Sequence, residues 1–192
     1  MDKISGPIGR KDAGLGLVVA LAGRLIDRPG STRSRFPLRN IPKVRARLAD
    51  TLADLNVRDL VSSAAAGADL LALEAAEARG IRRHVILPGD PSDFREHSVA
   101  SRPGPWPVLF DQLVLTPAPR LTLETLGLPV TAYTEVNAAI LERAQALARD
   151  AGTVPVVVLI WDADRGDGDT TADFGDRAQA AGFQRLEIST LT

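Results

Sequence analysis

Two continuous apolar runs constrain the fold of this chain more than any other feature of its sequence. They read GLGLVVALAG at 14–23 and VPVVVLIWD at 154–162, and such runs are typical of strands buried on both faces of a parallel sheet. Between them, 41–56 carries apolar residues at helical spacing, and 134–152 is the clearest helix because it begins at a threonine cap and ends at a glycine. Strands that alternate with helices predict an α/β fold, a Rossmann-like doubly wound, mainly parallel sheet with helices on both faces.

The rest of the pattern continues this alternation within one domain. A flexible tail is expected at 1–13 and a single domain at 14–192, because the 192 residues suffice for one hydrophobic core and no linker or repeat interrupts them. The other predicted elements are strands at 58–64, 82–89 and 183–190, helices at 67–80, 107–117 and 177–182, loops at 91–107 and 163–176, and a short strand or turn at 120–126.

The composition excludes several classes of protein. The chain has no cysteine, and therefore neither a thiol nucleophile nor a disulfide. No apolar run approaches the roughly 18 residues of a membrane span, and the N-terminus lacks the apolar core of a signal peptide, so we expect a cytoplasmic protein that does not bind membranes. A net charge of −1 argues against a general nucleic-acid binder, whereas a homodimer is compatible with the sequence.

Most of the unusual polar residues follow the predicted strands, at 23–37, 62–69, 87–99 and 161–173. Ligands of doubly wound sheets bind beyond the carboxyl ends of the strands, near the switch in strand order. We therefore predict a ligand site at these segments. Its predicted residues are Gly23, Arg24, Asp27, Arg35, Ser62, Ser63, Ala66, Gly67, Ala68, Asp69, Pro88, Phe94, Ser98, Trp161, Asp162, Gly168 and Thr170.

The stretch SSAAAGAD at 62–69 places small residues between a strand and a helix. The free amides at a helix start suit a phosphate or carboxylate, the serines add hydroxyl donors, and Gly67 allows close approach to the backbone. The alternative is structural: the small residues permit tight helix–sheet contact, and Asp69 complements the helix start.

Opposite charges gather in two loops. Arg24, Arg28, Arg33 and Arg35 follow the first strand, and guanidinium groups match phosphate oxygens. The acidic loop at 162–176 has little apolar anchoring beyond a phenylalanine, so we expect a mobile lid that meets the basic loop when ligand binds. The alternative is two solvated faces, since the chain uses arginine in preference to lysine almost everywhere.

Several common ligand motifs are absent from the sequence. There is no G-x-x-x-x-G-K-[ST] phosphate loop, and Gly14-x-Gly16 precedes the first strand where a dinucleotide fingerprint would follow it. The aspartates of the acidic loop superficially suggest calcium, but their order with glycine does not fit an EF-hand. We expect no metal and no cofactor.

The segment SSAAAGADLLALEAAEARGIRRHVILP resembles the S-x-A-x-GAD…E-A…G…LP segment of the SLOG superfamily, Rossmann-like domains related to DNA-processing and Lonely Guy proteins. AGRLIDRPG…RFP, DFREHSV, WD and GDGDTTAD also resemble, in order, SLOG-like domains found beside nucleotide cyclases or tetratricopeptide repeats. Two departures stand out: Gly23-Arg24 replaces the usual Gly-His, and LPGD replaces the phosphoribohydrolase motif P-G-G-x-G-T-x-x-E of Lonely Guy proteins.

The resemblance implies a module that senses a nucleotide or nucleotide-derived second messenger in bacterial signalling or conflict systems, with a separate effector or cyclase-linked protein as its partner. In the predicted site, phosphate lies on the amides of 66–69 beside Arg24 or Arg35. Ribose hydroxyls are held by Asp27, Asp69 or Asp162, and the base stacks near Trp161 or Phe94. The alternative is an enzyme that cleaves an N-glycosidic bond, with Glu74, Asp69 or Asp162 as its carboxylate. A third hypothesis is a DNA-contacting or purely structural oligomer module.

Overall fold

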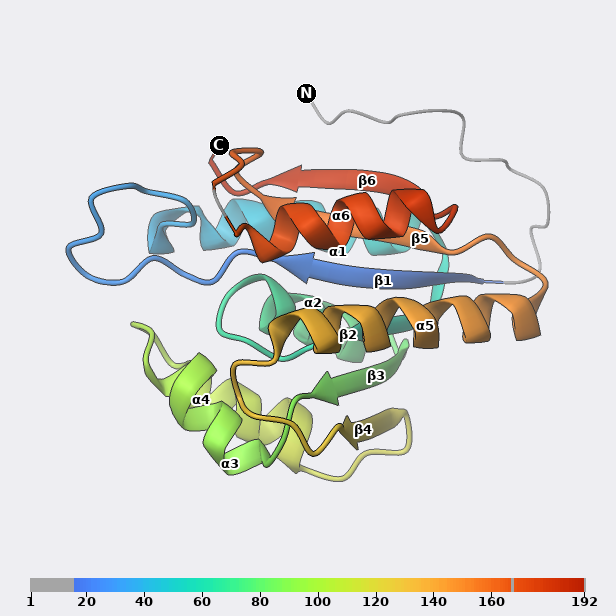
Figure 1. The fold of residues 1–192 in the computed structure, drawn as a ribbon, viewed down its shortest axis with the longest axis horizontal. Helices are drawn as coiled ribbons and strands as arrows, with labels where there is room; N and C mark the ends of the chain where they lie inside the picture. The colour runs from blue at the N-terminus through green and yellow to red at the C-terminus, as the bar shows by residue number, and fades with distance from the viewer. Residues whose placement is uncertain (1–15, 167, 192) are drawn as a thin grey trace.

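The computed structural model describes residues 16–166 and 168–191 and arranges six parallel strands in one sheet, in the order β4-β3-β2-β1-β5-β6 (Figure 1). The predicted Rossmann-like doubly wound α/β fold is confirmed, whereas the tail predicted at 1–13 lies outside the described residues. The strands are β1 (Leu17–Gly23), β2 (Val57–Ser62), β3 (Arg82–Leu87), β4 (Leu121–Thr125), β5 (Val156–Trp161) and β6 (Gln184–Ser189).

Helices cover both faces of the sheet (Figure 1). One face carries the helices that connect β1 through β4, and the other carries the two that follow β4. The first group contains the turn η1 (Leu38–Asn40), α1 (Ile41–Asp54), α2 (Ala68–Ala78), α3 (Pro91–Phe94), α4 (Trp106–Phe110) and the π-helical turns η2 (Arg95–Ala100) and η3 (Asp111–Leu115). The second contains α5 (Tyr133–Ala151) and α6 (Thr170–Ala180).

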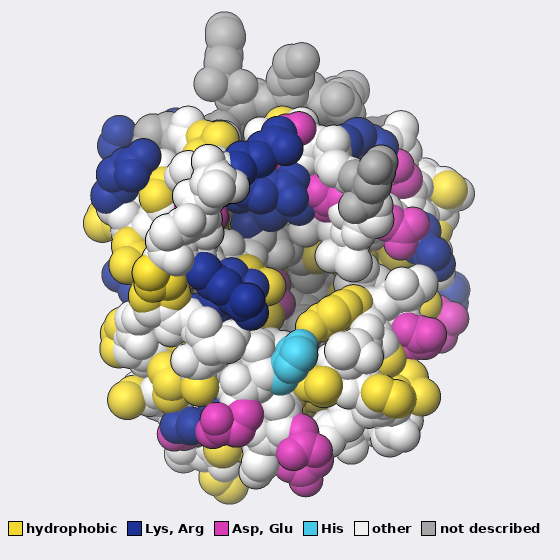
Figure 2. Space-filling view, turned by 60° about the vertical axis from the view of Figure 1, so that its left-hand side comes forward, with side chains coloured by type: hydrophobic (Ala, Val, Ile, Leu, Met, Phe, Trp, Pro, Cys, Tyr) yellow, Lys and Arg dark blue, Asp and Glu magenta, His cyan; other side chains and the backbone are white. Residues whose placement is uncertain are grey.

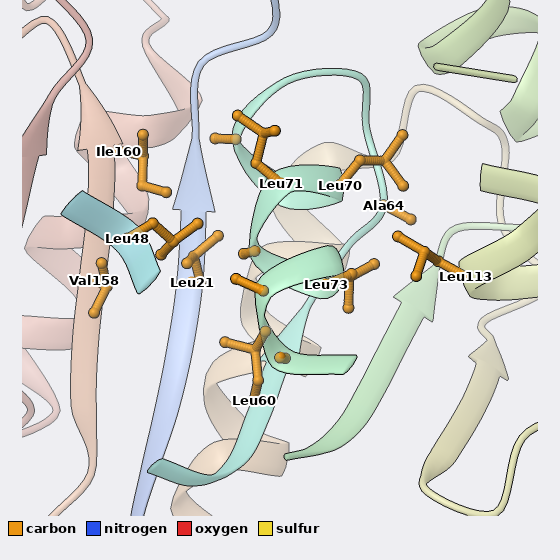
Figure 3. Packing of buried hydrophobic residues seen from close by; sticks show 14 of the residues in the cluster. Leu21, Leu48, Leu60, Ala64, Leu70, Leu71, Leu73, Leu113, Val158 and Ile160 are labelled. Atoms are coloured by element: carbon orange, nitrogen blue, oxygen red, sulfur yellow. The ribbon is translucent and has the colours of Figure 1, made fainter. Parts of the chain in front are cut away.

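The sheet divides the hydrophobic core into two layers, because successive side chains of a strand point to opposite faces. Leu21 of β1 belongs to the cluster formed with α1 and α2, whereas its neighbour Ala20 belongs to the cluster formed with α5 and α6. Figure 3 shows Leu48 of α1 beside Leu21, and Leu73 of α2 in the same layer. Burial on both faces explains why β1 and β5 read as continuous apolar runs.

Two predicted loops are largely helical. The segment predicted as a loop at 91–107 contains α3 and η2, because Asp90 accepts a hydrogen bond from the amide of Ser92 (2.7 Å) and a proline stands at the first helical position. Helix α6 begins at Thr170, within the predicted loop at 163–176, because the Asp169 carboxylate accepts from two amides of its first turn. The ambiguous segment at 120–126 is strand β4.

The strand order switches between β1 and β5. These strands are neighbours, but the chain leaves β1 toward α1 on one face and leaves β5 toward α6 on the other. Their carboxyl ends therefore border the crevice in which doubly wound folds bind ligands. Within the described residues, none of the helices is both long enough and apolar enough to cross a membrane.

Candidate functional site

An arginine–aspartate network of Arg24, Arg35, Asp162 and Asp169 fills the switch point. Arg24 follows β1 directly, and its Nε donates to Asp162, the residue after β5, at 2.7 Å. Its terminal nitrogens donate to Asp169 Oδ1 (2.7 Å) and to the carbonyl of Asp164 (2.8 Å). Arg35 binds the other oxygens of the same two carboxylates, Asp162 Oδ2 at 2.8 Å and Asp169 Oδ2 at 2.9 Å. Each guanidinium thus joins both carboxylates.

This network is buried, and its charges are mutually compensated. The side chains of Arg24, Asp162 and Asp169 are 8%, 1% and 2% exposed. Burial alone would raise the pKa of the Asp169 carboxyl, but hydrogen bonds from Arg24, the amide of Ala172 and Arg35 hold it well below its usual range. The pKa of Asp162 is lowered in the same way by Arg35 and Arg24. The two arginines predicted to bind phosphate therefore already hold carboxylates.

The basic and acidic loops meet in the structure at these four residues: Asp162 and Asp169 are paired with Arg24 and Arg35. The ordering of the acidic loop on ligand binding stays a prediction. Phe174 is fully buried and anchors α6, so the second half of the predicted lid is part of the core. Gly168 and Thr170 lie at this helix start and are exposed; Asn137 donates to the carbonyl of Thr170 (3.1 Å).

Asp27 organises the basic loop from within. Its carboxylate accepts from the amides of Arg35 (3.1 Å) and Phe36 (2.9 Å) and from the Ser34 hydroxyl (3.0 Å). The hydroxyl of Thr190 donates to the carbonyl of Arg35 and ties the loop to the end of β6. The Asp27 carboxylate, which was predicted to hold ribose hydroxyls, therefore uses its oxygens to close the loop.

The close approach at the small-residue stretch is made by the chain itself. Gly67 has φ +126°, and a Cβ there would lie 2.6 Å from the carbonyl of Arg24 and 2.8 Å from the amide of Ile26. The amide of Ala68 donates to Arg24 O (3.1 Å), and Ile26 N donates to Ala66 O (3.0 Å). A Cβ at Gly23 would lie 2.3 Å from that of Ala68. The structural alternative therefore accounts for these glycines.

The aromatic side chains predicted to stack on a base are buried. Phe94 is 2% exposed and packs against Phe110, with ring centroids 6.1 Å apart. Trp161 is 4% exposed, and the guanidinium groups of Arg24 and Arg185 each lie 5.6 Å from its ring centroid. All five phenylalanines and both tryptophans are buried, whereas Tyr133, at the start of α5, is 41% exposed.

Among the described residues, Asp69 is the buried carboxyl without a basic partner. It is 8% exposed, and its carboxylate accepts a hydrogen bond from the amide of Ala65, at 3.2 Å. Burial raises the pKa of Asp69 to about 7, against the opposing effect of this amide. By contrast, Asp59, Asp162 and Asp169 each accept from two or more basic side chains. Asp69 is therefore a group able to exchange a proton near neutral pH.

A second group of side chains at the carboxyl edge was not predicted as a unit. This carboxyl-edge cluster consists of Arg28, His97, Ser98, Arg102 and Tyr133. His97 Nε2 lies 3.1 Å from the Tyr133 hydroxyl, and Arg102 donates to the carbonyl of Ile26 (2.9 Å). Figure 2 shows this side of the molecule: its face is hollowed, and Lys or Arg side chains and a histidine border the hollow. Of the five, Ser98 was predicted as a ligand residue and Arg28 as a member of the basic loop, whereas His97, Arg102 and Tyr133 were missed because no local pattern of the sequence marks them.

The remaining predicted residues have structural contacts. The Ser62 hydroxyl donates to the carbonyl of Ser63 (2.8 Å), and the carbonyl of buried Pro88 accepts from Leu128 N (2.7 Å). Glu74, a candidate carboxylate of the N-glycosidase alternative, accepts from Arg45 Nε at 2.9 Å and forms an ion pair with it. In 16–166 and 168–191, no group of three or more His, Cys, Asp or Glu side chains is arranged to hold a metal ion.

Comparison with known proteins adds no relative: no family model matches the chain, and no curated protein matches its sequence.

Proposed function

We propose that this chain is a binding module for a nucleotide or a nucleotide-derived second messenger, held in the hollow at the carboxyl edge of the sheet. The observation that carries the proposal is the carboxyl-edge cluster: an exposed aromatic ring and basic side chains beside a hollow, at the edge where doubly wound sheets bind ligands (Figure 2). The resemblance of 62–88 to the SLOG superfamily supports the same class of ligand, and a signalling or conflict role read out by a separate effector.

The roles within the proposed site differ from those predicted. Tyr133 supplies the stacking surface, because the buried Phe94 and Trp161 cannot. Asp69 supplies the hydrogen-bonding carboxyl for ribose hydroxyls, because Asp27 and Asp162 use their oxygens within the fold.

A panel of mononucleotides, dinucleotides, cyclic nucleotides and ADP-ribose derivatives tests the proposal by thermal shift and titration calorimetry. We expect at least one member to raise the melting temperature. Base–aromatic stacking is worth about 1–3 kcal/mol, so Tyr133→Ala should weaken that ligand by roughly 5- to 150-fold. Tyr133→Phe should bind nearly as well, and Leu128→Ala, which removes another partly exposed apolar side chain, should change nothing. A flat response to the whole panel would contradict the proposal.

One observation favours the N-glycosidase alternative. A carboxyl with a pKa of about 7 in a buried setting is suited to protonate a departing base as a general acid. Chromatographic detection of free base from nucleoside monophosphates or NAD, lost in Asp69→Asn, would establish turnover. Ligand binding without base release would leave the chain a binding module.

A further inference from the structure

Arg102 is a half-buried arginine without a carboxylate partner among the described residues. One terminal nitrogen donates to the carbonyl of Ile26, while its Nε is buried with no hydrogen-bond partner in the part of the chain that the structure describes. The buried arginines Arg24 and Arg83 differ in holding carboxylates, since Arg24 pairs with Asp162 and Asp169, and Arg83 pairs with Glu77, although the Nε of Arg83 likewise has no hydrogen-bond partner among the described residues. The positive charge of Arg102 is therefore not neutralised by a contacting carboxylate in the described chain.

A second positive charge lies nearby. Burial lowers the pKa of Arg102, and repulsion from Arg28 lowers it further. Arg28 is exposed and forms no ion pair with another described residue. The nearby carboxylate of Asp27 opposes the shift. Among the described residues it accepts hydrogen bonds from two amides and a hydroxyl of the loop, so it is paired with neither arginine, although its charge offsets part of theirs. The two arginines therefore leave a net positive charge at the edge of the sheet.

An unused hydroxyl lies on the same segment as Arg102. Ser98 is 5% exposed, and its Oγ has no hydrogen-bond partner among the described residues. Its carbonyl accepts from the amide of Ala66 (3.1 Å), whose own carbonyl accepts from the amide of Ile26. Ile26 in turn accepts from Arg102. The Ser98 backbone and the Arg102 side chain are therefore both held against the linked pair Ala66 and Ile26.

We infer that Arg102, Arg28 and the Ser98 hydroxyl form an anion subsite for the phosphate groups of the ligand. Phosphate oxygens would accept from Arg102 Nε and Ser98 Oγ, two buried donors that need acceptors, and their charge would offset the two guanidinium groups. The inference rests on the proposed function and deepens it, because it moves the phosphate from Arg24 and Arg35 to a pair of arginines that hold no carboxylate.

Inorganic pyrophosphate tests the subsite without reference to base or sugar. Titration calorimetry of the full chain should show saturable binding. Arg28→Gln and Arg102→Gln should each weaken binding at least tenfold, and Ser98→Ala should weaken it severalfold. Arg149→Gln, at the opposite end of α5, should bind as the wild type does. Arg28 is exposed, so its substitution leaves the fold intact even if Arg102→Gln lowers the melting temperature.

The outcomes separate this inference from the proposed function. Absence of saturable pyrophosphate binding, or equal binding by wild type and Arg28→Gln, would overturn the subsite. A nucleotide that binds wild type and Arg28→Gln equally would keep the proposed function and remove the subsite. If pyrophosphate binding depends on Arg28 but no nucleotide of the panel binds, the subsite is kept and the nucleotide proposal is overturned.

Discussion

Replacing Arg24 with alanine should destabilise the fold far more than removing an equally well-formed surface ion pair. Arg24 makes hydrogen bonds of 2.7–2.8 Å to two carboxylates and one carbonyl, and both carboxylates are at most 2% exposed. Removing one partner of a buried ion pair costs about 3–5 kcal/mol, because the remaining charge stays buried. For a chain of this length, that loss corresponds to a fall in melting temperature of about 6–20 °C.

The matched control is Arg165→Ala. Arg165 donates to both oxygens of Asp176 at 2.7 and 2.8 Å, but both side chains are at least half exposed. Solvent screens such a pair, so its loss should leave the melting temperature unchanged within error. Thermal and urea denaturation at pH 7 measure both variants, and equal losses in the two would refute the argument from burial.

The same network has a pH signature with a defined sign. The pKa values of Asp162 and Asp169 are lowered in the folded chain, so their ion pairs contribute full stability above the unfolded pKa of about 4 and lose it as pH falls through the folded values. In Arg24→Ala the two carboxylates keep only one of their two arginines, Arg35, and therefore protonate more readily. The gap in stability between wild type and variant should therefore narrow as pH is lowered below about 4.

Two further predictions concern the start of α2. The pKa of Asp69 is raised from about 4 to about 7, so between these pH values the folded chain keeps a proton that the unfolded chain releases. This group therefore lowers the free energy of unfolding by up to about 4 kcal/mol as pH rises from 4 to 7. Asp69→Asn should remove that fall in urea denaturation across this range; a variant whose stability keeps the wild-type pH slope would contradict it. Gly67→Ala should destabilise by about 3 kcal/mol or more, because φ +126° strains any L side chain and its Cβ meets the backbone of Arg24 and Ile26. Retention of the wild-type melting temperature would show that the 24–26 backbone can move away.

The fold class could be predicted because burial on both faces leaves a direct mark on composition. The apolar runs at 14–23 and 154–162 contain β1 and β5, two interior strands that are neighbours at the switch point. The helical segments at 91–100 and 170–176 belong to stretches predicted as loops, 91–107 and 163–176, in which proline, serine, aspartate and glycine are frequent. In both cases one aspartate, Asp90 or Asp169, caps the first turn. A cap followed by a proline at 91 is a helix signal that average composition conceals.

The position of the strand-end residues at one edge of the sheet could be predicted for a topological reason, but the pairing among them could not. Any residue that follows a parallel strand lies at the carboxyl edge, so Arg24 and Asp162 could both be placed there from their positions alone. That they touch depends on β1 and β5 being neighbours, although 138 positions separate the two residues. Strand order is set by the whole sheet, and no local pattern around either residue encodes it.

Pairing within the fold also explains why the candidate site lies beside the switch point and not within it. The arginines at this edge are chemically alike, and their environment separates them into two classes. Arg24 and Arg35 form ion pairs with Asp162 and Asp169 and thereby fix the basic loop against the end of β5. Arg28, on the same fixed loop, has no such partner among the described residues, and its charge is left to act on a ligand. Arg24 and Arg35 thus hold the loop in place through their ion pairs, while the loop presents Arg28. Preorganised recognition of an anion requires such a fixed support.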